Sequence, residues 1–207
     1  GRGDPHAGDR VRLLVAGPEA HAGGREIDGG DSGEGMKVLG ITGWSGSGKT
    51  TLLSGLIPAL VKRGHRVSTI KHAHHAFDVD TPGKDSYEHR KAGATEVLVS
   101  SAKRWALMHE HRGAPEPGLE DLIAQMSPVD LLIVEGFKRD SHEKIEVFRR
   151  AVGKSLLARE DPRIVGIASD GPVPEVDRPL LDLNDIEAIA DFVVAHCGLA
   201  QAPRKEG

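Results

Sequence analysis

The fold is decided by one stretch, Lys37-Val38-Leu39-Gly40-Ile41-Thr42 followed by Gly43-Trp44-Ser45-Gly46-Ser47-Gly48-Lys49-Thr50. An apolar strand leads into a glycine-rich turn, and Thr51 through Gly64 continue with the apolar spacing of a helix. The turn fits the pattern G-x-x-x-x-G-K-[ST] of phosphate-binding loops. The order strand, loop, helix therefore predicts an α/β domain of the P-loop NTPase type.

The chemistry expected of this loop follows from its backbone. Glycines let successive N–H groups converge on one phosphate, and the helix that follows adds unpaired N–H groups and the positive end of its dipole. Lys49 is expected to reach the β- and γ-phosphates, and the Thr50 hydroxyl to ligate Mg²⁺. The alternative is a glycine-rich surface turn without a ligand, which the flanking strand and helix disfavour. The predicted nucleotide contacts are Gly43, Trp44, Ser45, Gly46, Ser47, Gly48, Lys49, Thr50 and Thr51.

Size and composition limit the remaining possibilities. The chain has 207 residues, a formal net charge of −4 and one cysteine. This length is typical of one domain, and a negative net charge does not indicate a nucleic-acid-binding protein. A single cysteine excludes an internal disulfide and a cysteine-rich zinc site. Since no apolar run reaches membrane-spanning length and no signal peptide is recognisable, we expect a cytoplasmic protein without a membrane partner.

The chain is expected to have three parts. Residues 1–35 hold ten of the 26 glycines, and a strand at Val11–Val15 could not bury a face alone. We therefore expect 1–35 to be a largely disordered extension, 36–197 to be the nucleotide-binding domain and 198–207 to be a flexible tail. From Met36 on, apolar runs alternate with helical patterns, which predicts a mainly parallel sheet with helices on both faces. Glu96–Ser100 and Trp105–His109 predict an antiparallel hairpin within it.

A carboxylate follows the most apolar strand. Leu131-Leu132-Ile133-Val134 reads as a strand buried on both faces and ends in Glu135-Gly136. In phosphate-loop proteins an acidic residue at this place binds Mg²⁺, so Glu135 is the second predicted metal ligand. Gly136 is expected to let the backbone pass close to the phosphates. The alternative is an ordinary carboxylate at the end of a strand.

Two polar loops are candidates for a second ligand or a switch. The first is Lys71-His72-Ala73-His74-His75, which follows a strand at Arg66–Ile70. Its three histidines could form a metal site, but no acidic or cysteine partner has matching spacing, so a polar loop that contacts phosphate is favoured. Asp78–Ser86 combines turn residues with charge before a helix for which Asp85 and Glu88 predict a capping box. It is interpreted as a second anion site, a mobile switch or a simple capped turn. The predicted residues are Lys71, His72, Pro82, Gly83, Lys84, Asp85, Ser86 and Lys138.

The identity of the base is left open by the residues alone. Asp170, in Ala168-Ser169-Asp170-Gly171, follows a strand and could accept two hydrogen bonds from a guanine. The chain has no Asn-Lys-x-Asp signature for reading guanine, so these residues favour neither GTP nor ATP.

Five motifs in order resemble one known family, the molybdopterin-guanine dinucleotide biosynthesis accessory protein B family (MobB). The resemblance covers about residues 36–192. The motifs are Gly43-Trp44-Ser45-Gly46-Ser47-Gly48-Lys49-Thr50-Thr51-Leu52, Ile70-Lys71-His72-Ala73-His74-His75, Asp80-Thr81-Pro82-Gly83-Lys84-Asp85-Ser86, Arg104-Trp105-Ala106-Leu107-Met108 and Val134-Glu135-Gly136-Phe137-Lys138.

The resemblance implies a GTP-binding adapter with at most slow GTP hydrolysis. It implies a guanylyltransferase as partner, molybdopterin as a candidate second ligand, and a homodimer, for which we expect the edge of Trp105–His109 to be the contact. Thr50 and Glu135 would hold Mg²⁺, Asp170 would read guanine, and Pro82–Ser86 with Arg104 would line the crevice.

The catalytic expectations are fewer. Lys49 and Arg104 would stabilise charge on the phosphates, and Asp80 is the candidate for positioning water. The alternative function is a small-molecule kinase that uses ATP and takes its acceptor at the His72–Ser86 loop.

Overall fold

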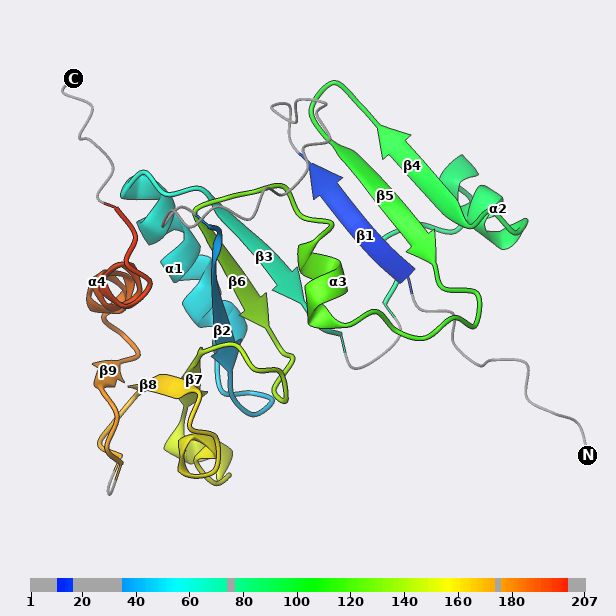
Figure 1. Cartoon of the computed structure of the whole chain (residues 1–207). Helices are drawn as coiled ribbons and strands as arrows, with labels where there is room; N and C mark the ends of the chain where they lie inside the picture. The colour runs from blue at the N-terminus through cyan, green and yellow to red at the C-terminus, as the bar shows by residue number, and fades with distance from the viewer. Residues whose placement is uncertain (1–10, 17–34, 74–76, 174–175, 201–207) are drawn as a thin grey trace, which may run out of the picture. The chain divides into compact units, whose positions relative to one another are not determined.

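In this computed structural model the chain is described at residues 11–16, 35–73, 77–173 and 176–200. It divides into two compact units (Figure 1). Asp31–His72 with Pro128–Gly207 form the phosphate-loop unit, and Gly1–Gly30 with Ala73–Ser127 form the hairpin unit. The domain expected at 36–197 therefore contains residues of both units.

The phosphate-loop unit is built on a six-stranded sheet in the order β3-β6-β2-β7-β8-β9. All neighbouring strands run parallel, which confirms the predicted α/β class. The short β9 was not anticipated from the sequence. The strands are β2 (Lys37–Thr42), β3 (Val67–Lys71), β6 (Leu131–Glu135), β7 (Lys144–Phe148), β8 (Ile164–Ser169) and β9 (Leu180–Asp182).

The register of three strands positions the site. Glu135 at the end of β6 lies opposite Ile41 of β2 on one side and Lys71 of β3 on the other. Because all three strands run in the same direction, the residues that follow each of them start from one edge of the sheet. The phosphate loop, Glu135 and Lys71 therefore share that edge.

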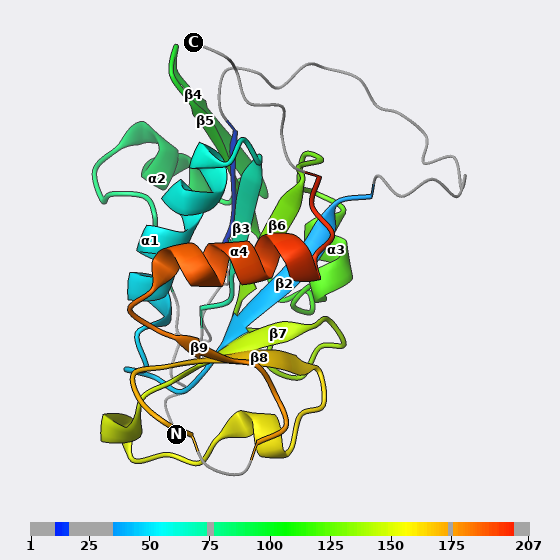
Figure 2. The same cartoon turned by 90° about the vertical axis from the view of Figure 1, so that its left-hand side faces the viewer.

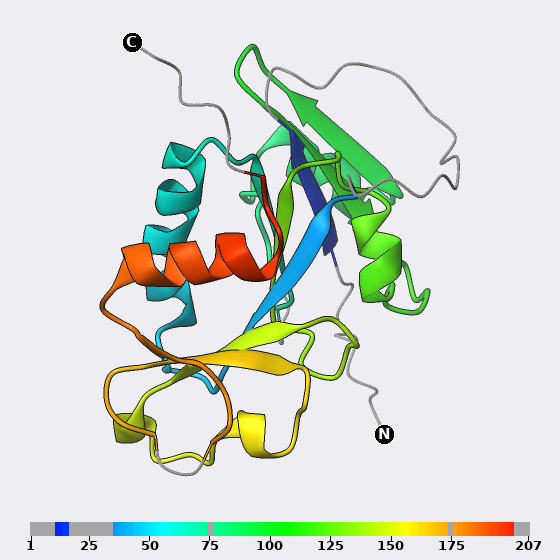
Figure 3. The same ribbon diagram turned by 60° about the vertical axis from the view of Figure 1, so that its left-hand side comes forward.

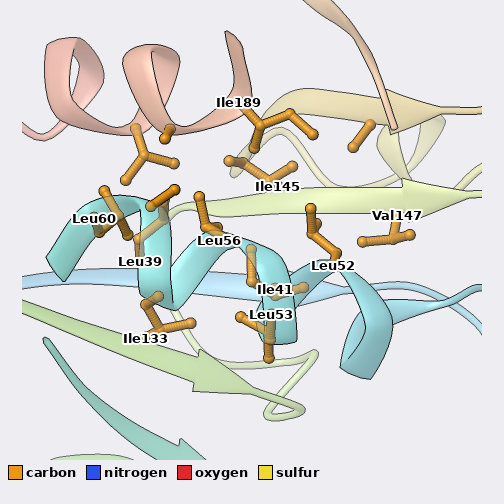
Figure 4. Packing of buried hydrophobic residues seen from close by; sticks show 14 of the residues in the cluster. Leu39, Ile41, Leu52, Leu53, Leu56, Leu60, Ile133, Ile145, Val147 and Ile189 are labelled. Atoms are coloured by element: carbon orange, nitrogen blue, oxygen red, sulfur yellow. The ribbon is translucent and has the colours of Figure 1, made fainter. Parts of the chain in front are cut away.

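Helices α1 (Lys49–Lys62) and α4 (Ile186–His196) pack on one face of this sheet (Figures 2 and 3). Helix α1 turns a leucine-rich stripe toward β2, β6 and β7 (Figure 4). Helix α4 begins at a side-chain cap, with the Asp185 carboxylate accepting a hydrogen bond from the Ala188 N–H at 3.0 Å. The labelled core residues are Leu39, Ile41, Leu52, Leu53, Leu56, Leu60, Ile133, Ile145, Val147 and Ile189.

The opposite face of β7 is covered by short 3-10 turns. Ile145 and Val147 point into the core beneath α1 and α4, so Glu146 between them points the other way. Its fully buried carboxylate accepts the N–H groups of Leu157 at 2.9 Å and Ala158 at 2.8 Å. These two N–H groups open a 3-10 turn at Leu157–Arg159, which is preceded by another at Arg150–Val152.

The hairpin unit contains the predicted hairpin, β4 (Glu96–Ser100) with β5 (Trp105–Glu110). A third strand, β1 (Val11–Ala16), pairs antiparallel with the other edge of β5. Part of the expected disordered extension is therefore a strand, because β5 supplies the hydrogen-bonding partner that it lacks on its own. The expectation of a free edge at Trp105–His109 is wrong for the same reason, since β4 is an outer strand and β5 is central.

Among its described residues the hairpin unit also contains the helices α2 (Asp85–Lys91) and α3 (Leu119–Ile123). The capping box predicted at Asp85 is wrong, since the N-cap is Lys84 and both Asp85 and Glu88 lie in the first turn. Acidic residues there still stabilise the helix through its dipole. Within the described ranges, no helix combines the length and apolar character needed to cross a membrane.

Candidate nucleotide-binding site

The phosphate loop begins at a glycine that no other residue can readily replace. Gly43 has a φ of 141°, outside the range that L side chains readily adopt. A β-carbon at Gly43 would lie 2.5 Å from the carbonyl oxygen of Val147 and 2.7 Å from the Ser47 hydroxyl. The turn out of β2 therefore passes tightly between β7 and the loop's own Ser47.

Lys49 holds the loop from within. Its ammonium donates hydrogen bonds to the carbonyl oxygens of Gly43 at 3.1 Å and Trp44 at 3.0 Å. In a planar trans peptide the N–H points opposite to the C=O, so the N–H groups of Trp44 and Ser45 face away from the ammonium's side of the chain. Lys49 is thus half-buried beside the loop and fixes the direction of the peptides that would contact a phosphate.

The charges around Lys49 favour an anion. Burial lowers the pKa of Lys49; the Glu135 carboxylate opposes this, and the ammonium groups of Lys138 and Lys71 add to the lowering. Lys71 Nζ lies 3.7 Å from Glu135 Oε2. Three ammonium groups thus act near one carboxylate, and this excess positive charge would attract a phosphate.

The start of α1 and a buried hydroxyl also fit an anion. The helix begins after Gly48, with no side-chain cap and no acidic residue in its first turn, so its first N–H groups remain available. Ser47 is 2% exposed, and its hydroxyl finds no hydrogen-bond partner within the part of the chain that the structure describes. The loop therefore offers an anion hydrogen-bond donors from both the backbone and a side chain.

Trp44 anchors the loop to a neighbouring segment. Its indole N–H donates to the carbonyl oxygen of Ser155 at 2.7 Å. The ammonium groups of Lys138 and Lys154 lie 4.7 Å and 5.9 Å from its ring centroid. Because the Trp44 side chain is engaged in these contacts, we expect only the Trp44 backbone to contact the nucleotide.

Glu135 stands where the predicted Mg²⁺ ligand should be. Its side chain is 14% exposed, and it follows the apolar strand β6 at the edge that carries Lys49. Gly136 packs against His72, since a β-carbon at Gly136 would lie 2.8 Å from the His72 Cβ. Its close approach to the phosphates stays a prediction. The joint role of Glu135 and Thr50 as metal ligands stays a prediction.

The histidine loop is described as far as Ala73. The His72 N–H donates to the Glu135 carbonyl oxygen at 2.9 Å, and its ring centroid lies 4.7 Å from that of Phe137. His74 and His75 lie outside the described residues. Among the residues that are described, no three or more His, Cys, Asp or Glu side chains are grouped so as to hold a metal ion.

Arg149 is a site residue that sequence analysis missed. Its Nε donates to the carbonyl oxygen of Ser47 at 3.0 Å, and its Nη1 donates to Asp170 Oδ2 at 3.1 Å. The structure thereby connects the predicted base-reading residue Asp170 to the phosphate loop. The signal in the sequence was the basic pair Arg149-Arg150, which directly follows the residues of β7 and so lies at the carboxyl edge of the sheet.

The remaining predicted residues belong to the hairpin unit. The side chain of Asp80 is 8% exposed, and its Oδ1 accepts the Thr81 N–H at 3.0 Å and the Ser86 hydroxyl at 2.9 Å. Asp80 therefore shapes the turn that contains Pro82, Gly83, Lys84 and Asp85. Arg104 is exposed in the β4–β5 turn, where the Ser101 hydroxyl donates to its carbonyl oxygen at 3.0 Å. The water-positioning role of Asp80 and the charge-stabilising role of Arg104 stay predictions.

Known proteins resemble this chain over most of its length. The family model MobB, described as "Molybdopterin guanine dinucleotide synthesis protein B", matches residues 38–170, from β2 to Asp170. The chain belongs to the MobB family. The molybdopterin-guanine dinucleotide biosynthesis adapter protein of Escherichia coli is 50% identical over 164 residues, which cover 77% of this chain and 92% of the relative.

Other MobB proteins extend the comparison. The Haemophilus influenzae adapter protein is 46% identical over 161 residues, which cover 76% of this chain and 88% of that relative. A crystal structure of Bacillus subtilis MobB has a TM-score of 0.61 at 22% identity and covers 78% of this chain and 98% of that one. That structural likeness confirms the fold.

Proposed function

We propose that this MobB protein is an Mg·GTP-binding adapter in the formation of molybdopterin guanine dinucleotide, where it assists the guanylyltransferase. The observation that carries the proposal is the position of Lys49, whose ammonium bridges two loop carbonyls amid a local excess of positive charge. The names of the E. coli and H. influenzae relatives support the adapter role.

The proposed nucleotide contacts divide by chemistry. The loop amides from Gly43 to Thr51 would bind phosphate oxygens, and Lys49 would supply a point charge to them. Thr50 and Glu135 are the proposed holders of Mg²⁺, an ion that takes oxygen ligands and commonly keeps one or two protein groups in phosphate sites. Bound there, the ion would neutralise charge on the phosphates.

Guanine is proposed as the base, with Asp170 as its reader. A carboxylate can accept hydrogen bonds from N1–H and the exocyclic amine of guanine, and adenine offers no such pair of donors. Inosine triphosphate differs from GTP only in lacking the exocyclic amine, so comparing the two affinities measures the contribution of that contact. We expect Asp170→Asn to lower the affinity for GTP more than that for ATP.

Catalysis is proposed to be slow at most. The candidate water-positioning residue Asp80 accepts hydrogen bonds at both carboxylate oxygens, including one from Arg90 Nε at 3.4 Å. A carboxylate occupied in this way is poorly suited to orient a water molecule. Lys49 and Arg104 would then act chiefly in binding.

A second ligand is proposed at the edge of the sheet that carries Glu135, with Lys71, His72 and Lys138 as its contacts. The turn Pro82–Ser86 of the hairpin unit, organised by Asp80, is a separate candidate for an anion site or a switch. Molybdopterin carries a phosphate, and cationic and backbone N–H groups would suit it. The proposed assembly also includes a second copy of the chain.

Measuring nucleotide binding and turnover together distinguishes the proposed adapter from the alternative, a small-molecule kinase. The experiment is a titration of the protein with GTP and ATP in Mg²⁺, followed by an assay of phosphate release and of capture of a molybdenum cofactor guanylyltransferase. The adapter predicts a preference for GTP, slow release and complex formation. Equal affinity for ATP with several turnovers per second on a small acceptor would favour the kinase.

A further inference from the structure

Arg149 connects two parts of the phosphate-loop unit that are far apart in sequence. It follows β7 directly, and its guanidinium reaches the Ser47 carbonyl on one side and the Asp170 carboxylate on the other, at 3.0 Å and 3.1 Å. The side chains of Arg149 and Asp170 are 33% and 30% exposed, so the pair is partly shielded from water. A rigid guanidinium fork can hold both acceptors at once, which an ammonium cannot do equally well.

The hydrogen bond to Ser47 has a consequence for phosphate binding. Because the Ser47–Gly48 peptide is planar, a carbonyl fixed toward Arg149 directs the Gly48 N–H to the opposite side. Gly48 has a φ of 96° and is the N-cap of α1, so this N–H belongs to the set that would surround a phosphate. A β-carbon at Gly48 would lie 3.1 Å from Arg149 Nε, which shows how closely the guanidinium packs on the loop.

We propose that Arg149 is a positioning residue for the phosphate loop, and that Asp170 acts on the loop through Arg149 in addition to any contact with the base. Lys49 fixes the first half of the loop through Gly43 and Trp44, and Arg149 fixes the second half through Ser47. The inference rests on the proposed nucleotide site, because a positioned loop needs a phosphate to show the effect.

A ligand without a base isolates this role. Inorganic tripolyphosphate offers phosphates alone, so a residue that only reads guanine cannot influence its binding. We would measure its affinity and that of GTP in Mg²⁺ by calorimetry, for the wild-type protein and for Lys49→Ala, Arg149→Met, Arg149→Lys, Asp170→Ala and the double variant Arg149→Met/Asp170→Ala. Arg150→Met is the matched control, since Arg150 is exposed and donates to the Pro172 carbonyl at 3.1 Å, outside the loop.

The expected result is a loss of tripolyphosphate affinity of roughly 10-fold for Arg149→Met, with a smaller loss for Asp170→Ala. Arg149→Lys should not restore binding, because lysine lacks the fork. The double variant should lose no more than Arg149→Met alone, since the two residues act in series. Arg150→Met should bind as the wild type does, and the thermal midpoints of all variants, measured in parallel, should stay within a few degrees of one another.

Unchanged tripolyphosphate affinity in both Arg149→Met and Asp170→Ala would overturn the inference. If the wild type binds and Lys49→Ala does not, the proposed nucleotide site would survive that outcome. If the wild type binds neither ligand, the proposed function fails and this inference fails with it. Loss of affinity together with loss of thermal stability in Arg149→Met would also count against a positioning role. Arg149→Lys would then decide: if it keeps the wild-type thermal midpoint and still fails to restore binding, folding alone is not the cause.

Discussion

A β-carbon built on Gly136 would lie 2.8 Å from the Cβ of His72, so the ends of β6 and β3 are in direct backbone contact. The same two strands are joined by the hydrogen bond from the His72 N–H to the Glu135 carbonyl oxygen at 2.9 Å. This contact fixes the edge from which Glu135 and Lys71 project. It links the integrity of the sheet to the geometry of the candidate site.

Gly136→Ala should therefore destabilise the protein. The φ of 102° is strained for alanine, and the new methyl group would collide with an atom attached to the His72 backbone, which cannot rotate away. We expect a loss of about 1–3 kcal/mol in the free energy of unfolding, measured by urea denaturation. Gly35→Ala is the control, since a β-carbon there meets nothing within 4 Å. Equal stability of the two variants would contradict this prediction.

Arg90→Met should destabilise the hairpin unit more strongly. Arg90 is 7% exposed and donates to Asp78 at 2.8 Å, to Glu110 at 3.0 Å and to Asp80 at 3.4 Å. Removing the cation leaves carboxylates without their partner, and a buried ion pair broken in this way typically costs about 3–5 kcal/mol. Chemical denaturation would measure the loss. The control is Arg66→Met, whose ion pair with Asp130 is exposed and should be worth about 1 kcal/mol or less.

The stability should fall in acid through His142. Burial, followed by the charge of Lys144, lowers the pKa of His142 from 6.5 to about 4, and neither ring nitrogen has a hydrogen-bond partner among the described residues. The imidazole is therefore neutral in the folded chain but binds a proton in the unfolded chain below pH 6.5. Folding stability that is complete above this pH is lost as the pH falls toward 4, by up to roughly 2–3 kcal/mol.

The measurement is the free energy of unfolding from pH 8 to pH 4 for the wild type and for His142→Gln. The variant cannot titrate, so its stability should decline less across the same range. Proton NMR of the folded wild type should show the His142 ring still neutral at pH 5.5. Protonation of this ring near pH 6.5 would refute the explanation.

The outer strand of the hairpin unit predicts where a second copy would bind. β4 is at the edge of its sheet, and Leu98 and Val99 on it are 58% and 45% exposed. An exposed apolar edge strand is a template for pairing with another chain. Leu98→Lys should therefore shift the protein toward monomer in light-scattering measurements, and Lys103→Ala in the adjacent turn should not. A dimer unaffected by Leu98→Lys would place the contact elsewhere.

Local sequence signals predicted the phosphate-loop unit well, and long-range pairing explains most of what they missed. The strand at Lys37–Thr42 and the helix that follows its loop are predicted from neighbouring residues alone. The strand Val11–Ala16 depends on β5, because Val11 pairs with Glu110, 99 positions later, and Ala16 pairs with Trp105, 89 positions later. No local pattern could establish this pairing. The 3-10 turn at Leu157–Arg159 likewise depends on a distant residue, because Glu146 on β7 accepts the N–H groups of Leu157 and Ala158.

The candidate site shows the same division. The sequence predicted the positions of Lys49 and Glu135 at one edge of the sheet, since each has a fixed place relative to a strand end. It did not identify Arg149, because its significance lies in contacts to residues 102 positions earlier and 21 positions later. The sequence also could not foresee that Asp80 would be enclosed by Ser86 and Arg90, since those contacts depend on how the turn folds back on α2.

Binding of GTP through Lys49 is tested most directly by the affinity of the protein for GTP in Mg²⁺, compared with that of Lys49→Ala and of Lys62→Ala, a lysine exposed at the end of the same helix. Removing the Lys49 ammonium takes away its charge and two loop contacts. We predict that Lys49→Ala binds GTP roughly 10- to 100-fold more weakly, and that Lys62→Ala binds as the wild type does. The same GTP affinity in all three proteins would contradict a phosphate site at this loop.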